Sequence, residues 1–158
     1  MITVKINGEE RQYPQGATYE DVANDYQEEY DNLIALAARD GKIRELFKKL
    51  TRDCEITFFT LKDDVGNKTY VRSATMLFLK AVFDVFGRET VQNCRVEFAI
   101  GNGSYISPKG KINATEENAA KIRNRMRELV EAKTPFLKKS YSLDNAMELF
   151  RREGMKDK

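Results

Sequence analysis

Residues 70–108 constrain the fold of this chain more than any other stretch. Gly87 suits the C-terminus of a helix that precedes it. The alternation in residues 95–100 predicts a half-buried strand, with a Gly101-Asn-Gly103 turn and a returning strand at 105–106. The helix has a wide apolar face at Tyr70, Ala74, Leu77, Phe78, Ala81, Val85 and Phe86. A helix that is apolar on more than one side must pack between other elements, so we expect it to lie centrally in an α+β domain.

The charge of the chain changes near Leu61. Residues 1–61 contain 8 Lys/Arg and 12 Asp/Glu, a net charge of −4, whereas residues 62–158 contain 19 and 13, a net charge of +6. The polar, Gly-containing stretch 62–68 lies at this change. We therefore predict a first domain over residues 1–61, a linker over 62–69 and a second domain over 70–158.

The first domain is predicted to be a sheet with one helix. Thr18 is the expected helix N-cap, with Asp21 supporting the first turn. Asn7-Gly8 and Asp40-Gly41 are strong signals for tight hairpin turns. The predicted strands are 2–6, 11–13, 33–38, 42–47 and 55–60, and the apolar helix face is Tyr19, Val22, Ala23 and Tyr26.

This order of elements is that of a ubiquitin-like β-grasp fold. The segments Val4–Gly8, Pro14-x-Gly16, the helix from Thr18, and Ala37–Lys42 resemble the TGS domain that precedes the editing domain in threonyl-tRNA synthetases. The resemblance implies RNA or a small regulatory ligand as a partner. The net negative charge opposes phosphate binding, however, so we favour a packing or protein-interaction role for this domain.

The second domain resembles the editing domain of threonyl-tRNA synthetases, which is also found in alanyl-tRNA editing proteins. Residues 70–108 carry this resemblance, together with Ile122-x-x-x-Met126-x-x-Leu129, Pro135-Phe136, Ala146-x-x-Leu149-Phe150 and Gly154. In that family the central helix opens with a His-x-x-x-His motif that supplies the editing chemistry or binds metal. Those positions are Arg72 and Met76 here, and the chain contains no histidine. The family's later Cys-x-x-x-His pair is also missing, so we expect a truncated fragment of a longer protein.

These departures bear on catalysis and on metal binding. Ester hydrolysis requires a general base or a metal-activated water. Without histidine the remaining candidates are Cys94 and carboxylates such as Glu97, and a mid-strand Glu97 is more typical of a surface or ion-pair role. Cys54 and Cys94 lack CxxC spacing and are expected to be reduced, buried thiols. We therefore expect no bound zinc, no other metal and no cofactor in this chain.

Two functions are compatible with these resemblances. One family joins a TGS-like module and a histidine-poor synthetase-like domain to a kinase of the uridine kinase type. The Arg72-Ser73 helix start, the Gly101–Tyr105 turn and the Met155–Lys158 ending resemble that family. This implies a non-catalytic regulatory or ligand-binding region of a nucleoside kinase, with its own C-terminal kinase domain as partner. ATP and magnesium would belong to that kinase domain, because this chain has no GxxxxGK[ST] loop. The alternative is a tRNA-binding or trans-editing module related to threonyl-tRNA synthetase.

The candidate ligand-binding residues are Arg72, Ser73, Gly101, Asn102 and Gly103. Arg72 would offer planar donors to a phosphate or carboxylate, or would form an internal ion pair. The Gly-x-Gly sequence is an ordinary tight turn rather than a dinucleotide fingerprint. Thr115 and Ser142 are the expected N-caps of two further helices. The first of these helices has a predicted buried stripe at Ala119, Ile122, Met126, Leu129 and Val130. Its opposite, basic side at Lys121, Arg123, Arg125 and Arg127 is explained by a solvated helix partly balanced by Glu128 and Glu131, or by tRNA binding.

The sequence predicts a cytoplasmic location. The N-terminus lacks the basic and apolar regions of a signal peptide. No apolar run approaches the roughly 20 residues that a membrane-spanning helix needs, so we expect no membrane partner.

Overall fold

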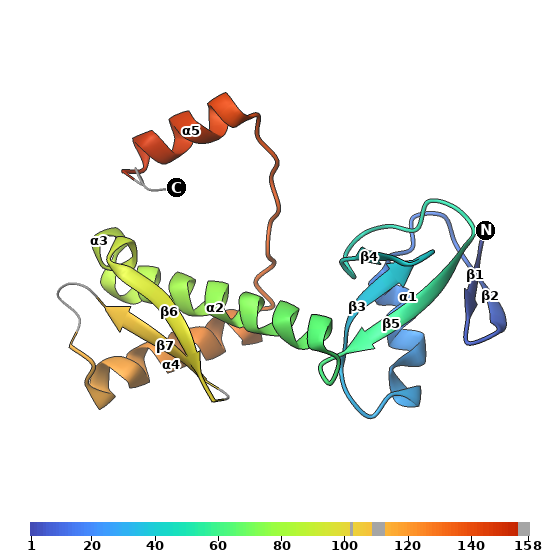
Figure 1. Ribbon diagram of the computed structural model, residues 1–158, viewed down its shortest axis with the longest axis horizontal. Coiled ribbons are helices and arrows are strands. Elements are labelled where there is room, and N and C mark those ends of the chain that lie inside the picture. The colour runs from blue at the N-terminus through green and yellow to red at the C-terminus, as the bar shows by residue number, and fades with distance from the viewer. Residues whose placement is uncertain (102, 109–112, 155–158) are drawn as a thin grey trace. The chain divides into compact units, whose positions relative to one another are not determined.

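Figure 1 shows the computed structural model of the chain, which describes residues 1–101, 103–108 and 113–154. Its contacts divide into two compact units, Met1–Ala74 and Thr75–Lys158. Helices are combined with a mixed sheet, which confirms the α+β class. The elements that begin in the first unit are β1 (Ile2–Ile6), β2 (Glu9–Tyr13), α1 (Tyr19–Tyr26), the 3₁₀ turn η1 (Gln27–Glu29), β3 (Ile34–Arg39), β4 (Lys42–Arg44), β5 (Cys54–Thr60) and α2 (Asp64–Phe86).

The first unit contains a five-stranded sheet in the order β2-β1-β5-β3-β4. The central strands β1 and β5 are parallel, and the other neighbours are antiparallel. Asn7 and Gly8, and likewise Asp40 and Gly41, all have positive φ. This is the backbone that a two-residue hairpin turn requires, so both predicted turns are confirmed. The return strand predicted over 42–47 is shorter than expected and ends at Arg44.

Helix α1 supplies one side of the core of this unit. Its N-terminus has a capping box: the Asp21 N–H donates to Thr18 Oγ1 at 3.1 Å, and the Thr18 N–H donates to Asp21 Oδ2 at 2.7 Å. All four residues of the predicted apolar face are buried. They pack with sheet residues into a single cluster that includes Val4, Ile6, Ile34, Ala37, Ile56 and Phe58.

The central helix begins earlier than the sequence predicted. Helix α2 starts at Asp64, not at Tyr70, so most of the predicted 62–69 linker is helical. The Asp63 carboxylate accepts from the Thr60 N–H at 2.7 Å, and the Asp63 carbonyl accepts from the Asn67 N–H at 2.8 Å. These bonds join the end of β5 directly to the first turn of α2. The division between the units falls inside α2, after Ala74, and the predicted domain boundary stays a prediction.

The second unit contains the rest of α2, a hairpin and, among the described residues, three further helices. The Gly87 N–H donates to the Phe83 carbonyl at 2.9 Å and closes the end of α2, as predicted. Phe98 and Tyr105 face each other across the hairpin with their rings stacked, 5.3 Å between centroids. The elements are α3 (Arg88–Gln92), β6 (Cys94–Ile100), β7 (Gly103–Pro108), α4 (Glu116–Glu131) and α5 (Leu143–Arg152).

The predicted caps of the last two helices are confirmed, but two residues of the predicted buried stripe of α4 are exposed. Thr115 caps α4 and Ser142 caps α5 through their side-chain oxygens. Leu129 is buried and Ile122 and Met126 are half-buried, whereas Ala119 is exposed and Val130 is 60% exposed. Among the described residues, none of the helices is long and apolar enough to cross a membrane.

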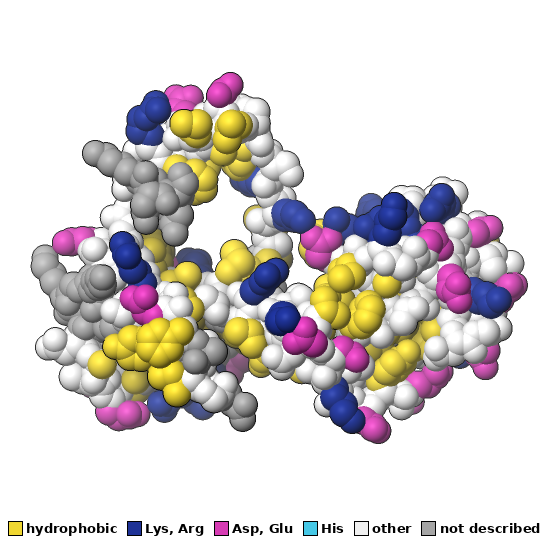
Figure 2. Space-filling model, in the orientation of Figure 1, with side chains coloured by type: hydrophobic (Ala, Val, Ile, Leu, Met, Phe, Trp, Pro, Cys, Tyr) yellow, Lys and Arg dark blue, Asp and Glu magenta, His cyan; other side chains and the backbone are white. Residues whose placement is uncertain are grey.

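The surface carries both signs of charge in each unit. Figure 2 shows Lys and Arg side chains (dark blue) interspersed with Asp and Glu over much of the visible face. Along the upper edge of the right-hand unit, where β4 and the loop after it lie in Figure 1, the dark blue side chains gather more closely.

Candidate functional site

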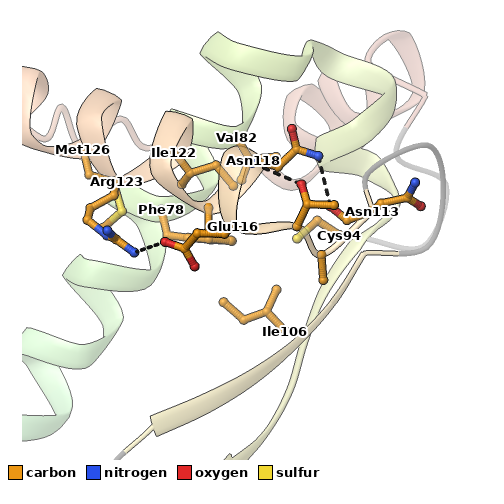
Figure 3. Close-up of a pocket in the computed structure, with 13 residues that line it drawn as sticks. Phe78, Val82, Cys94, Ile106, Asn113, Glu116, Asn118, Ile122, Arg123 and Met126 are labelled. Carbon is orange, nitrogen blue, oxygen red and sulfur yellow. Dashed lines mark hydrogen bonds and ion pairs between the residues drawn. The ribbon is translucent and has the colours of Figure 1, made fainter.

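The second unit contains an open groove of about 510 Å³ between α2, the hairpin and α4. Figure 3 shows that β6 and β7 contribute one wall through Cys94 and Ile106, that α2 contributes a second through Phe78 and Val82, and that α4 contributes a third. The full lining consists of Phe78, Val82, Cys94, Ile106, Asn113, Ala114, Thr115, Glu116, Asn118, Ala119, Ile122, Arg123 and Met126. Because most of these side chains are apolar, the groove is suited to a largely apolar or aromatic group with a few polar contacts at its rim.

The polar rim of the groove lies at the start of α4. Arg123 Nη2 donates to Glu116 Oε1 at 3.4 Å across one end of it. The Asn118 side-chain amide donates to the Asn113 carbonyl at 3.0 Å, and the Asn118 N–H donates to Thr115 Oγ1 at 3.3 Å. These bonds fix the rim groups in place, so they can orient a ligand.

The groove has little capacity for acid–base or nucleophilic chemistry. Burial raises the pKa of the Cys94 thiol above its usual value, so the thiol is neutral near pH 7 and is a weak nucleophile. The carboxylate at the rim, Glu116, is paired with Arg123. The sequence has no histidine to serve as a base, and the described residues contain no cluster of metal-ligating side chains. Among the described lining residues, the groove therefore presents a neutral thiol and a paired carboxylate to a ligand, beside largely apolar walls.

A charged cluster holds the two helical walls of the groove together. Asp84 on α2 accepts from Lys80 on the same helix and from Arg125 Nε on α4, the latter at 2.9 Å. Arg125 also donates to Glu128 at 2.8 Å. The hydrogen bond from Lys80 and the contact with Arg125 lower the pKa of Asp84, so the carboxylate is ionised at neutral pH.

The predicted basic side of α4 is therefore largely neutralised by neighbouring carboxylates. Lys121 pairs with Glu117 at 2.7 Å, and Arg123 and Arg125 have the partners described above. This agrees with the solvated, locally balanced helix that the sequence allowed. It gives the tRNA-binding reading of this helix side little support.

The residues predicted to bind a ligand are distributed between the two units. Arg72 is exposed on α2, and among the described residues no carboxylate forms an ion pair with it. Ser73 Oγ donates to the Thr69 carbonyl of its own helix at 3.1 Å. Gly101 has φ +55 at the hairpin turn, Gly103 begins β7, and Asn102 lies outside the described residues. None of the four described residues lines the groove, and the predicted site stays a prediction.

Sequence reasoning did not identify the groove as a site. Its lining comes from three separate segments, and only their packing brings Val82, Cys94 and Ile122 together. One signal was present: the apolar stripe of α4 at Ile122 and Met126 was predicted to be buried, and it forms the α4 wall.

Comparisons with known proteins identify threonine–tRNA ligases among the relatives of the chain. No family model matches the chain. A threonine–tRNA ligase from Thermotoga maritima is 29% identical over an alignment of 160 positions, which covers 98% of this chain and 24% of the relative. Threonine–tRNA ligases from Maricaulis maris and Pelagibacter ubique are 28% and 25% identical, again over 98% of this chain and 24% of each relative.

The chain thus spans about a quarter of the length of the curated relatives that it matches. The matches support the predicted resemblance to threonyl-tRNA synthetase along essentially the whole chain. They lend no support to the uridine kinase reading, to a kinase partner or to a downstream ATP site.

Proposed function

We propose that this chain is a threonyl-tRNA-synthetase-related module that binds tRNA and does not hydrolyse the aminoacyl ester. The observation that carries the proposal is the extent of the match. Relatives named as threonine–tRNA ligases align with 98% of the chain, which includes both units. Both units of this chain align with these relatives, but the chain contains no histidine to act as a base. Tight binding of tRNA requires no histidine, whereas ester hydrolysis requires a base or a metal-activated water.

The architecture of the first unit supports a more specific assignment of this unit as a TGS-like module. A sheet with parallel central strands β1 and β5, flanked by β2 on one side and β3 and β4 on the other, is the arrangement expected of a β-grasp fold. One helix, α1, packs on this sheet in the position that the sequence order predicted.

The second unit supports the editing-like reading in the same way. A long central helix, a hairpin with a Gly-containing turn, and two further capped helices follow the order of the resemblance. The groove lies between these elements, and its apolar walls and fixed polar rim suit a nucleobase or an aminoacyl group. We place the end of a bound tRNA in this groove.

Binding of tRNA by the whole chain tests this proposal. Fluorescence anisotropy should give a dissociation constant for tRNA at least about tenfold below that for an unstructured RNA of the same length, a difference of about 1.4 kcal/mol. A tRNA shortened at its 3′ end should lose part of this preference. If tRNA and the length-matched RNA bind equally well at every salt concentration, the proposed function is wrong.

A further inference from the structure

One segment of the first unit has the opposite charge to the rest of that unit. Residues 1–61 carry a net charge of −4. Within them, residues 39–52 contain only two carboxylates, Asp40 and Glu45. The same 14 positions contain six cations, which are Arg39, Lys42, Arg44, Lys48, Lys49 and Arg52. This basic segment therefore carries a net charge of +4 that the average over the domain conceals.

The fold brings the cations of the basic segment to one surface. In the antiparallel β3–β4 pair, Arg39 lies opposite Lys42 and Ala37 lies opposite Arg44. Because alternate residues of a strand share a face, Arg39, Lys42 and Arg44 project from the same side of the sheet. Arg39 and Arg44 lie near the buried Tyr19 hydroxyl, where their charges oppose the rise that burial causes in the pKa of Tyr19.

The loop after β4 is tied back to the same surface. Arg39 Nη1 donates to Thr51 Oγ1 at 2.9 Å, and Arg52 Nη2 donates to Asp40 Oδ2 at 3.0 Å. The isolated bridge between Thr18 and Lys49 fixes the middle of this loop beside the start of α1. The dark blue side chains along the upper edge of the right-hand unit in Figure 2 mark this region.

Two of the six cations of the basic segment are paired with carboxylates. Asp40 pairs with Arg52, and Glu45 pairs with Lys48 at 2.7 Å. No ion pair joins the other four cations, Arg39, Lys42, Arg44 and Lys49, to a carboxylate within the part of the chain that the structure describes. This differs from α4, where glutamates neutralise most of the basic side.

We propose that the basic segment binds the phosphate backbone of RNA. The choice of RNA as the ligand rests on the proposed function. Several unpaired cations along a strand pair and a loop match the closely repeated charges of a nucleic-acid backbone better than a single small anion. The acidic residues elsewhere in the unit do not prevent this. At physiological ionic strength a charge is screened beyond about 8 Å, so the local charge governs binding and not the average over the domain.

Two variants of the full chain that remove the same number of charges test the inference. Lys42→Gln with Lys49→Gln removes two exposed cations from the basic segment. Lys5→Gln with Lys68→Gln removes two exposed cations from β1 and α2 of the same unit. β1 is separated from β4 by β5 and β3, a distance of about 14 Å at the usual strand spacing.

We expect the basic-segment variant to raise the dissociation constants for tRNA and for length-matched RNA alike, by about tenfold or more at low salt. The plot of log affinity against log salt concentration should become shallower by about two, one for each lost phosphate contact. The control variant should bind both RNAs as the wild type does. Equal thermal melting of the three proteins would show that folding is unchanged.

The outcomes separate this inference from the proposed function. If the two variants bind RNA equally well, the basic segment is not the phosphate contact, although a wild-type preference for tRNA would still support the proposed function. If the wild type binds both RNAs alike and the basic-segment variant loses both, the inference stands and the tRNA-specific function fails. A wild type that binds no RNA overturns both.

Discussion

Replacing Ile56 with alanine is expected to lower the free energy of unfolding of the first unit by about 2–5 kcal/mol. Ile56 is 2% exposed and lies on β5, between the strands β1 and β3. The substitution removes apolar contacts and leaves a cavity at the centre of the sheet. Strand β5 is hydrogen-bonded to a strand on each side, so the surrounding structure can relax only partly into that space.

Ile43→Ala is the matched control for this prediction. It makes the same chemical change in the same sheet, but Ile43 is 49% exposed on the short strand β4. We expect it to cost less than about 1 kcal/mol, because little buried apolar surface is lost. Urea unfolding followed by circular dichroism measures both values. Similar losses for the two variants would mean that the β5 core is not packed as described.

Gly66→Ala is expected to destabilise the protein by about 2–3 kcal/mol, even though alanine is the better helix former. A Cβ atom at position 66 would lie 2.0 Å from the Thr60 carbonyl oxygen and 2.9 Å from the Thr60 carbonyl carbon. That carbonyl cannot easily move, because it accepts from the Asp63 N–H and belongs to the strand that pairs with Ile34. The clash therefore outweighs the helix-propensity gain of about 1 kcal/mol.

Asn67→Ala controls for helix propensity at the adjacent, exposed position of α2. We expect a change within about 0.5 kcal/mol, since Asn67 contacts the Asp63 carbonyl through its backbone N–H, which alanine retains. Thermal melting of the two variants measures the difference. A Gly66→Ala protein as stable as the wild type would show that α2 does not approach β5 this closely.

Local signals in the sequence predicted most of the secondary structure. The Asn7-Gly8 and Asp40-Gly41 turns require positive φ, and Thr18, Thr115 and Ser142 cap their helices through bonds that span three residues. Each of these features depends on a few neighbouring residues, which is why the sequence reveals it.

The features that depend on distant contacts were missed. Gly66 was interpreted as part of a linker, whereas its lack of a side chain lets α2 pack against the end of β5. The groove arises only when α2, the hairpin and α4 meet. The net charge of residues 1–61 was treated as uniform, although the β3–β4 pairing and the Arg39–Thr51 contact gather the cations on one surface.

Binding without ester hydrolysis is tested by the rate at which an aminoacyl-tRNA loses its amino acid when the protein saturates it. Mischarged tRNA is incubated with the full chain at a concentration well above the measured dissociation constant, and the loss of the ester is followed with time. Because the groove offers a neutral Cys94 thiol, a paired Glu116 and no histidine, we expect the hydrolysis rate of the protein-free control, or a slower rate if the bound ester is shielded from water. A hydrolysis rate that rises with protein concentration and saturates would overturn this expectation and identify the chain as a trans-editing hydrolase.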